Sequence, residues 1–267
     1  MNMDFLKFDE TQIITFAIIL GTIFIYIFLE RIIPYNKQKF FREDWFDDFF
    51  LYNIFQSAIL GFIIFKLIIF VDSSTGISRL NIISHWPVWL QVILFLVVHD
   101  FYIYWMHRAQ HRNKYLWRLH EAHHSPKDID WLAGVRSNPL EIFINQTIEF
   151  LPIFLLGAAP EVVFYKGALS SIWGMHIHGN ININSGFLQY FINGPEMHRW
   201  HHDKKALNRN FATKLAIWDW IFGTAYLPKG EKAGKYGIAI PGYPRGYLKQ
   251  TLFSMRAFPR SNKKKRD

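Results

Sequence analysis

Long apolar runs alternate with short charged stretches along the chain. Residues 12–29 are almost wholly apolar, and a second run, 49–71, contains only a few polar residues. A third run begins at Val88, directly after Pro87, and continues past His99 and Asp100 to Met106. Because roughly 20 apolar residues of helix span a bilayer, these runs predict three membrane-spanning helices.

Two further apolar stretches, 142–157 and 162–175, are less convincing as independent spans because charged residues such as Glu149 and Lys166 interrupt them. They are joined by the short segment 158–160, which contains a proline. The pattern predicts a helical hairpin that enters the membrane and returns, with its polar residues facing protein or a cavity. Farther along, Pro195 in a first-turn position predicts a short helix that carries residues 198–202.

Charge then orients the predicted spans. The net charge is +9, and the loops after the first and third runs hold many of the Lys and Arg residues. The positive-inside rule places both loops in the cytoplasm and the N-terminus outside, and it explains the basic balance better than nucleic-acid binding does. The first run follows acidic residues, so we expect no cleavable signal peptide. With no cysteine, disulfides and thiolate metal sites are excluded.

The histidines are concentrated in one part of the chain, because 11 of the 12 lie between residues 99 and 202. Residues three and four apart share one face of a helix, so each cluster is predicted to project two or three imidazoles together. Imidazole binds Fe, Zn, Cu and Ni. Eight such ligands are more than one tetrahedral metal ion can bind, but they are enough for two metal ions. The clusters are His107 and His111; His120, His123 and His124; and His198, His201 and His202.

The remaining histidines and the residues near them allow further expectations. His85 is interpreted as an ordinary hydrogen-bonded core histidine, and His178 is favoured over His176 as a further ligand. Asp100 and Tyr104 share the helix face of His107, so either could contact a metal-binding imidazole from its outer side. Asp100 could fix the tautomer of such a ring, or it could only cap or pack the end of the third span. His99 lies off that face, and Arg136 and Glu141 are interpreted as a salt-bridged helix start.

At these residues the chain resembles the fatty acid hydroxylase and sterol desaturase superfamily. The resemblance covers about residues 90–226 and rests on Asp100-x-x-x-Tyr104-Trp105-x-His107-x-x-x-His111, on both H-x-x-H-H boxes and on His178-Gly179-Asn180. Asn210-Phe211 and the segment 218–224 resemble the family's closing segment, although Ala212 stands where members often have glycine.

The resemblance implies an all-α, multi-pass transmembrane bundle with a cytoplasmic, histidine-rich helical cap. The resemblance places the catalytic domain at 90–226. The apolar runs predict N-terminal transmembrane helices and loops at 1–89, and the residues after the resemblance predict a basic cytoplasmic tail at 227–267 that ends in Lys263-Lys264-Lys265-Arg266. The resemblance also implies two irons held by His107, His111, His120, His123, His124, His178, His198, His201 and His202.

The implied activity is O2-dependent hydroxylation or desaturation of a lipid, such as a sterol or fatty acyl chain. Electrons would come from a separate transfer protein, in a bacterial inner membrane or an endoplasmic reticulum-like membrane. Two alternatives stay open from the residues alone. One is a zinc-dependent membrane hydrolase with Glu121 as base, although H-E-x-H-H is not the H-E-x-x-H spacing. The other is a non-enzymatic metal transporter or store.

Overall fold

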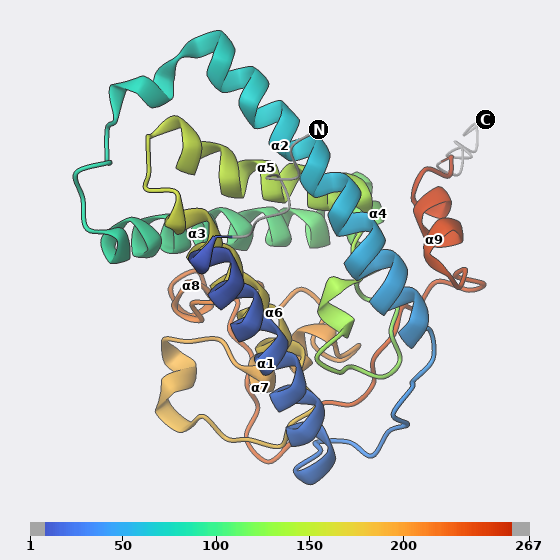
Figure 1. The fold of residues 1–267 in the computed structure, drawn as a ribbon. Coiled ribbons are helices and arrows are strands. Elements are labelled where there is room, and N and C mark those ends of the chain that lie inside the picture. The colour runs from blue at the N-terminus through green and yellow to red at the C-terminus, as the bar shows by residue number, and fades with distance from the viewer. Residues whose placement is uncertain (1–8, 258–267) are drawn as a thin grey trace, which may run out of the picture.

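The computed structural model describes residues 9–257, and that part of the chain is helical, with one isolated bridge pair between Pro34 and Ile181 and no strand. Figure 1 shows the long helices α1, α2 and α3 around α5 and α6, with α7 and its neighbouring loops gathered at the lower end of the view. The α-helices are α1 (Glu10–Ile32), α2 (Gln56–Thr75), α3 (Val88–Arg112), α4 (Lys114–His120), α5 (Pro139–Leu155), α6 (Glu161–His178), α7 (Pro195–His202), α8 (Ile217–Ile221) and α9 (Tyr247–Ser254). The short helical elements are η2 (Asp47–Phe55), η3 (Ile77–Leu80), η4 (Ala133–Val135) and η5 (Gly186–Tyr190).

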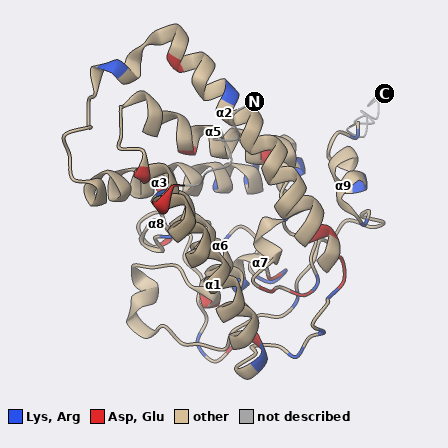
Figure 2. Cartoon of the chain, in the orientation of Figure 1, with Lys and Arg blue, Asp and Glu red and all other residues tan. Residues whose placement is uncertain are grey.

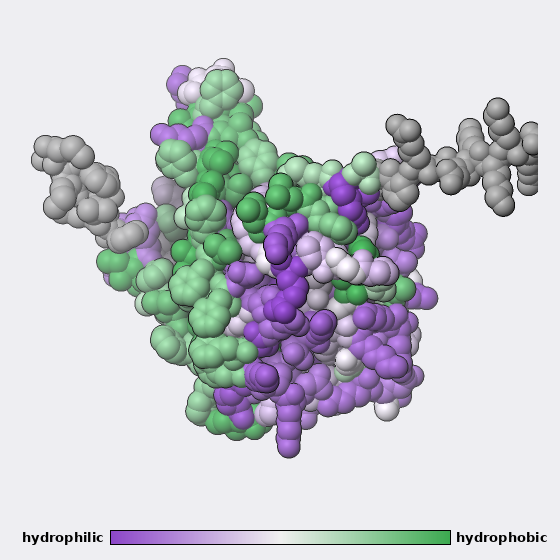
Figure 3. Space-filling view, turned by 90° about the vertical axis from the view of Figure 1, so that its right-hand side faces the viewer, coloured by the Kyte–Doolittle hydropathy of each residue, from purple (hydrophilic) through white to green (hydrophobic). Residues whose placement is uncertain are grey.

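The three predicted spans are confirmed as helices that are long and apolar enough to cross a membrane: α1, the continuous helix formed by η2 and α2, and α3. Their outer faces leave large apolar side chains uncovered, as for Phe24 and Phe70, each 68% exposed. Figure 2 shows few charged residues along α1 and α2, and Figure 3 shows apolar surface along one side of the molecule beside a polar face. Apolar surface of this extent fits lipid rather than water.

Local sequence explains where these helices begin and end. Asp9 caps α1 by accepting a hydrogen bond from the Gln12 backbone N–H at 2.8 Å. The Gln12 side chain in turn accepts a hydrogen bond from the Asp9 backbone N–H, which completes a capping box. Gly76 ends α2 in a left-handed conformation that favours glycine. The π-helical η2 turns Asp48 and Tyr52 into the protein interior, where the Asp48 carboxylate pairs with the Arg136 guanidinium.

The predicted hairpin is present as α5 and α6, which are not among the three candidate spans; its entry into the membrane stays a prediction. α6 packs against α1, α3 and α7, so it connects the apolar helices to the histidine-bearing ones. Glu30 on α1 strengthens this link, because its buried carboxylate accepts the backbone N–H groups of Trp131 and Asn180 at 2.7 and 2.8 Å.

The described part of the C-terminal segment packs against the rest of the molecule. The Tyr52 hydroxyl donates to Gln250 on α9 at 2.6 Å, and the Asp203 carboxylate accepts the backbone N–H groups of Gly234 and Lys235. The division of the chain at residues 89 and 226 stays a prediction, and the basic end at 263–266 lies outside the described residues.

Candidate metal centre

Nine histidines converge where α3, α4, α6 and α7 meet. They form two groups, and within each group the nearest ring nitrogens all lie within 4.8 Å of one another. The first group has five members: His107, His111, His120, His124 and His201. The second has four: His123, His178, His198 and His202.

The Nε2 atoms of each group point toward one another. In the second group, His178 Nε2 lies 2.9 Å from His198 Nε2 and 3.3 Å from His123 Nε2. In the first, the His107 and His120 Nε2 atoms are 3.0 Å apart. Two nitrogens bound at right angles to a metal at about 2.1 Å are themselves about 3.0 Å apart. The spacing therefore fits the edges of a metal coordination shell.

Hydrogen bonds on the outer side of the rings strengthen this fit. The Nδ1 atoms of His178 and His123 face the carbonyl oxygens of Gly174 at 2.8 Å and Arg136 at 3.2 Å. A carbonyl only accepts, so both Nδ1 atoms carry the hydrogen, and in a neutral ring Nε2 then presents a lone pair. Two lone pairs facing each other across 3.3 Å repel unless a cation lies between them. The donor set thus fits a bound metal ion.

Each H-x-x-H-H box is divided between the two groups, which corrects the expectation of three imidazoles on one helix face. α4 ends at His120, and His123 and His124 follow in a turn that sends their rings to different groups. On α7, His198 and His202 belong to one group while His201 belongs to the other. Each of these two boxes therefore bridges both groups.

Burial keeps the rings neutral. The side chains of His124, His201 and His202 are buried, and loss of water lowers their pKa values well below the usual 6.5, with neighbouring histidines lowering them further. Neutral imidazole is the ligating form, so the groups are ready to bind metal near neutral pH.

Asp100 does not contact a histidine, so the expectation that it fixes a tautomer directly is wrong. Its carboxylate accepts four hydrogen bonds of 2.8–3.0 Å, from the Thr213 hydroxyl, the backbone N–H groups of Lys214 and Leu215, and the Trp218 indole. This loop also contains Phe211, whose carbonyl accepts the His107 Nδ1–H at 2.7 Å. Asp100 acts on His107 through the loop.

Residues 218–224 also hold the loop that contains Phe211. The Asp219 carboxylate accepts the backbone N–H groups of Phe211 and Ala212 at 2.8 and 2.9 Å. The Tyr104 hydroxyl pairs with Thr224 at 2.8 Å and accepts from Arg108 at 3.0 Å, so it too lies behind the ligands without touching them.

Glu141 is the contact that sequence reasoning missed. Its buried carboxylate accepts the Nδ1–H of His120 at 2.8 Å and a hydrogen bond from Gln110 at 2.7 Å. Arg136, which sequence reasoning paired with it, instead binds Asp48 on η2 at 2.7 Å. The only sequence signal for Glu141 was a carboxylate in the first turn of a largely apolar helix.

The other histidines lie outside the two groups. His85 is exposed and touches the edge of Trp86, so the expectation of a core histidine is wrong. His176 bonds the Tyr26 hydroxyl of α1 through Nδ1 at 2.8 Å. His99 is buried against Lys166, at 2.9 Å. Glu121 pairs with Arg256 at 2.9 Å, so it is not a free carboxylate base for the zinc hydrolase alternative.

Two cavities lie among the helices near the histidines. The inner cavity, about 240 Å³, is lined by His107, His123, His178 and His198 and by residues of α3, α5 and α6. The outer cavity, about 410 Å³, lies among α1, η2, α5 and α6 and shares with the inner one the residues Gly134, Ile142, Gln146, Glu149, Ser170 and Gly174. The two cavities therefore adjoin each other, and the inner one borders both histidine groups.

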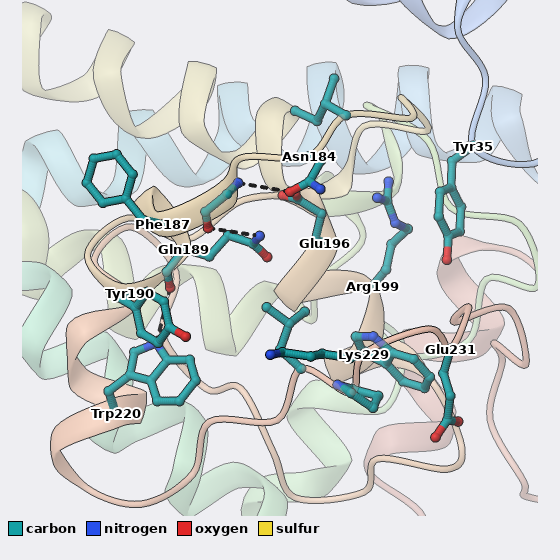
Figure 4. A pocket seen from close by; sticks show the side chains of 15 residues that line it. Tyr35, Asn184, Phe187, Gln189, Tyr190, Glu196, Arg199, Trp220, Lys229 and Glu231 are labelled. Carbon is teal, nitrogen blue, oxygen red and sulfur yellow. Dashed lines mark hydrogen bonds between the residues drawn. The ribbon is translucent and has the colours of Figure 1, made fainter.

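A third hollow, about 560 Å³, opens on another face of α7. Figure 4 shows Arg199 of α7 beside Tyr35 on one side of this hollow and Trp220 beside Tyr190 on the other, with Glu196 between them. The Arg199 guanidinium lies 3.7 Å from the centre of the Tyr35 ring and donates to the Gly179 carbonyl at 3.2 Å. It holds α7 against the turn that follows His178, and no histidine lines this hollow.

Comparison with known proteins gives a consistent picture. The model of the fatty acid hydroxylase family matches residues 92–224. Ornithine lipid hydroxylase from Rhizobium tropici is 28% identical over 243 residues, which cover 88% of this chain and 73% of that protein. Human alkylglycerol monooxygenase is 33% identical over 155 residues, 57% of this chain and 34% of the human protein. Human lathosterol oxidase is 30% identical over 136 residues, 51% of this chain and 44% of that protein. No solved structure matches the chain.

Proposed function

The chain belongs to the fatty acid hydroxylase family, and we propose that it is a membrane enzyme that uses O2 and two iron ions to hydroxylate or desaturate a lipid. Its relatives are lipid hydroxylases, alkylglycerol monooxygenases and sterol oxidases by name. The apolar helices and the adjoining cavities, the inner of which borders the histidines, support a substrate that arrives from the membrane.

The observation that carries the metal assignment is the pair of facing Nε2 lone pairs of His123 and His178. We assign one iron to His107, His111, His120, His124 and His201, and the other to His123, His178, His198 and His202. When bound and reduced, the irons would supply the activation of O2 and the removal of hydrogen from an unactivated C–H bond, which no side chain achieves by acid–base chemistry.

The chain's own residues fix the ligands and shape the space beside them. Carbonyl oxygens of Phe211, Gly174 and Arg136 hold three rings with Nε2 inward, and Glu141 holds a fourth. Gly134 lets the chain pass close to His178, because a Cβ there would lie only 2.6 Å from the ring.

Substrate, orientation and electron supply complete the proposal. The long match to ornithine lipid hydroxylase supports hydroxylation of a polar membrane lipid. The positive-inside rule supports a cytoplasmic position for the histidines, within reach of a separate electron-transfer protein. No flavin or haem motif is recognised in the sequence, which supports an external donor.

The test is metal analysis combined with turnover. Protein purified in detergent and loaded anaerobically should hold two irons per chain. After reduction, O2 and a membrane lipid extract should yield a lipid heavier by one oxygen, or lighter by two hydrogens, detected by mass spectrometry. One tightly held zinc per chain, with no oxidised lipid from iron-loaded protein, would refute the proposal.

A further inference from the structure

A buried charged cluster lines the inner cavity on three helices. The Lys166 ammonium, which is fully buried, donates to the Glu149 carboxylate and, at 2.9 Å, to His99 Nδ1. The Ser170 hydroxyl adds a bond to Glu149 at 2.8 Å. Burying each ion costs several kcal/mol, and ionisable groups among membrane helices usually serve function. The ligand contacts described above do not use this cluster.

The Lys166 contact fixes the tautomer of His99. An ammonium group only donates, so His99 Nδ1 accepts and Nε2 carries the hydrogen. His99 is 8% exposed, and its Nε2 has no hydrogen-bond partner among the described residues; the Asn145 carbonyl lies nearby but outside bonding geometry. His99 lines the inner cavity, and its unpaired Nε2–H is buried in the cavity wall.

Lys214 supplies a second unpaired donor to the same wall. The residue is 7% exposed and lines the inner cavity, and within residues 9–257 its ammonium has neither a hydrogen bond nor an ion pair. The neighbouring acids are already engaged: Asp100 accepts four hydrogen bonds, and Glu149 binds Lys166. Lys214 is therefore a buried cation without a counter-ion at hydrogen-bonding distance.

We propose that the inner cavity binds an anionic oxygen group of the lipid, a carboxylate or a phosphate, through the Lys214 ammonium and the His99 Nε2–H. An anionic acceptor would accept hydrogen bonds from both donors and neutralise the Lys214 charge. An alkyl chain would leave the donors unpaired and the charge without a counter-ion. Lys166 and Glu149 then act as positioning residues that hold His99 in its donor tautomer. The inference rests on the proposed function and adds that the substrate is an anionic lipid.

The inner cavity then holds the anionic group, and the hydrocarbon runs from it toward the histidines that line the same cavity. The outer cavity, which no histidine lines, adds apolar side chains such as Ile19, Phe150 and Met175 beside it. His99 lies eight residues before His107 on α3, about 12 Å along the helix axis. The anionic group would be held inside the protein, and the spacing between this anchor and the histidines would select which carbon is oxidised.

Binding without turnover tests the proposal. Iron-loaded protein in a neutral detergent is titrated with laurate, methyl laurate and dodecyl phosphate. We expect the wild type to bind at least one of the two anions at least tenfold more tightly than the uncharged ester. Lys214→Gln and His99→Phe should each reduce this preference, and Lys214→Arg, which keeps the charge, should retain it. Lys249→Gln, a change of an exposed lysine on α9, is the matched control.

The comparison of the two anions identifies the source, because tighter laurate indicates a carboxylate and tighter dodecyl phosphate a phosphate. Equal affinity of the wild type for ester and anions would overturn the proposal, as would a full preference in Lys214→Gln. The iron content of each variant is measured alongside. Anion preference in a protein that holds no iron would support the anchor and refute the proposed function. Iron binding without anion preference would refute the anchor and leave the proposed function intact.

Discussion

The Glu141 carboxylate accepts the Nδ1–H of His120 at 2.8 Å from a position 21 residues away in the sequence. The bond joins the start of α5 to the end of α4 and turns His120 Nε2 toward the first group. A carboxylate behind an imidazole raises its basicity and fixes its orientation.

Glu141→Ala should therefore weaken the first metal position. Loss of such an outer partner reduces metal affinity or activity by about 10–100-fold. Iron per chain, measured by elemental analysis after dialysis, should fall toward one, and product formation should fall with it. Glu231→Ala, at an exposed glutamate, should change neither; unchanged iron retention in Glu141→Ala would contradict the role.

Single ligand substitutions should empty one position at a time. His201→Ala removes a ligand of the first group and His202→Ala one of the second, although the two are adjacent in sequence. Each variant should retain about one iron by elemental analysis, with Mössbauer spectra that differ because different irons remain, and product should be lost in both. His176→Ala, which loses the hydrogen bond to Tyr26 and no ligand of either group, should keep two irons. Identical residual spectra would argue against the division of the boxes.

Gly134→Ala should disturb His178 alone. The added Cβ would lie 2.6 Å from Nδ1 and 2.9 Å from Cε1 of that ring, so the ring must shift and the second group loses its geometry. We expect about one iron per chain and loss of turnover with little change in melting temperature. Gly61→Ala places its Cβ in open space and should gain up to about 1 kcal/mol of helix stability; full activity in Gly134→Ala would show that the close approach is not required.

Asp48→Ala should destabilise the protein. Asp48 pairs with the buried Arg136 at 2.7 Å and with the buried Arg42 at 2.8 Å, and removing one partner of a buried pair costs about 3–5 kcal/mol. The melting temperature in detergent should fall sharply. Glu43→Ala, which breaks only exposed pairs with Arg245 and Lys127, should cost less than about 1 kcal/mol. Equal effects of the two substitutions would exclude the buried pair as the cause.

Run length and spacing in the sequence predicted much of the fold. The apolar runs predicted α1, α2 and α3, because a helix that faces lipid must be apolar along most of its length. Pro195 predicted the first turn of α7. The histidine boxes likewise identified which rings to expect together, and the structure brings all nine into the two groups.

The sequence did not predict how the boxes divide. The division of the second box depends on α4 ending at His120, and that of the third depends on how α7 is placed between the two groups; both are tertiary effects that helix periodicity does not contain. Contacts such as Glu141 with His120, or Asp100 with the loop that holds Phe211, join residues 21 to more than 100 positions apart. No single-sequence pattern reports pairs at such separations, so the sequence left open whether Asp100 contacts a histidine or only packs the end of the third span.

The Glu30 carboxylate reaches from the first span to the backbone N–H groups of Trp131 and Asn180, the latter two residues after His178. A fragment trimmed to residues 92–224, the stretch that matches the family, would leave both of these buried amides without their acceptor. An expression strategy built on that boundary should therefore yield a collapsed or metal-poor product, and the smallest autonomous unit of this enzyme should begin no later than the helix that carries Glu30.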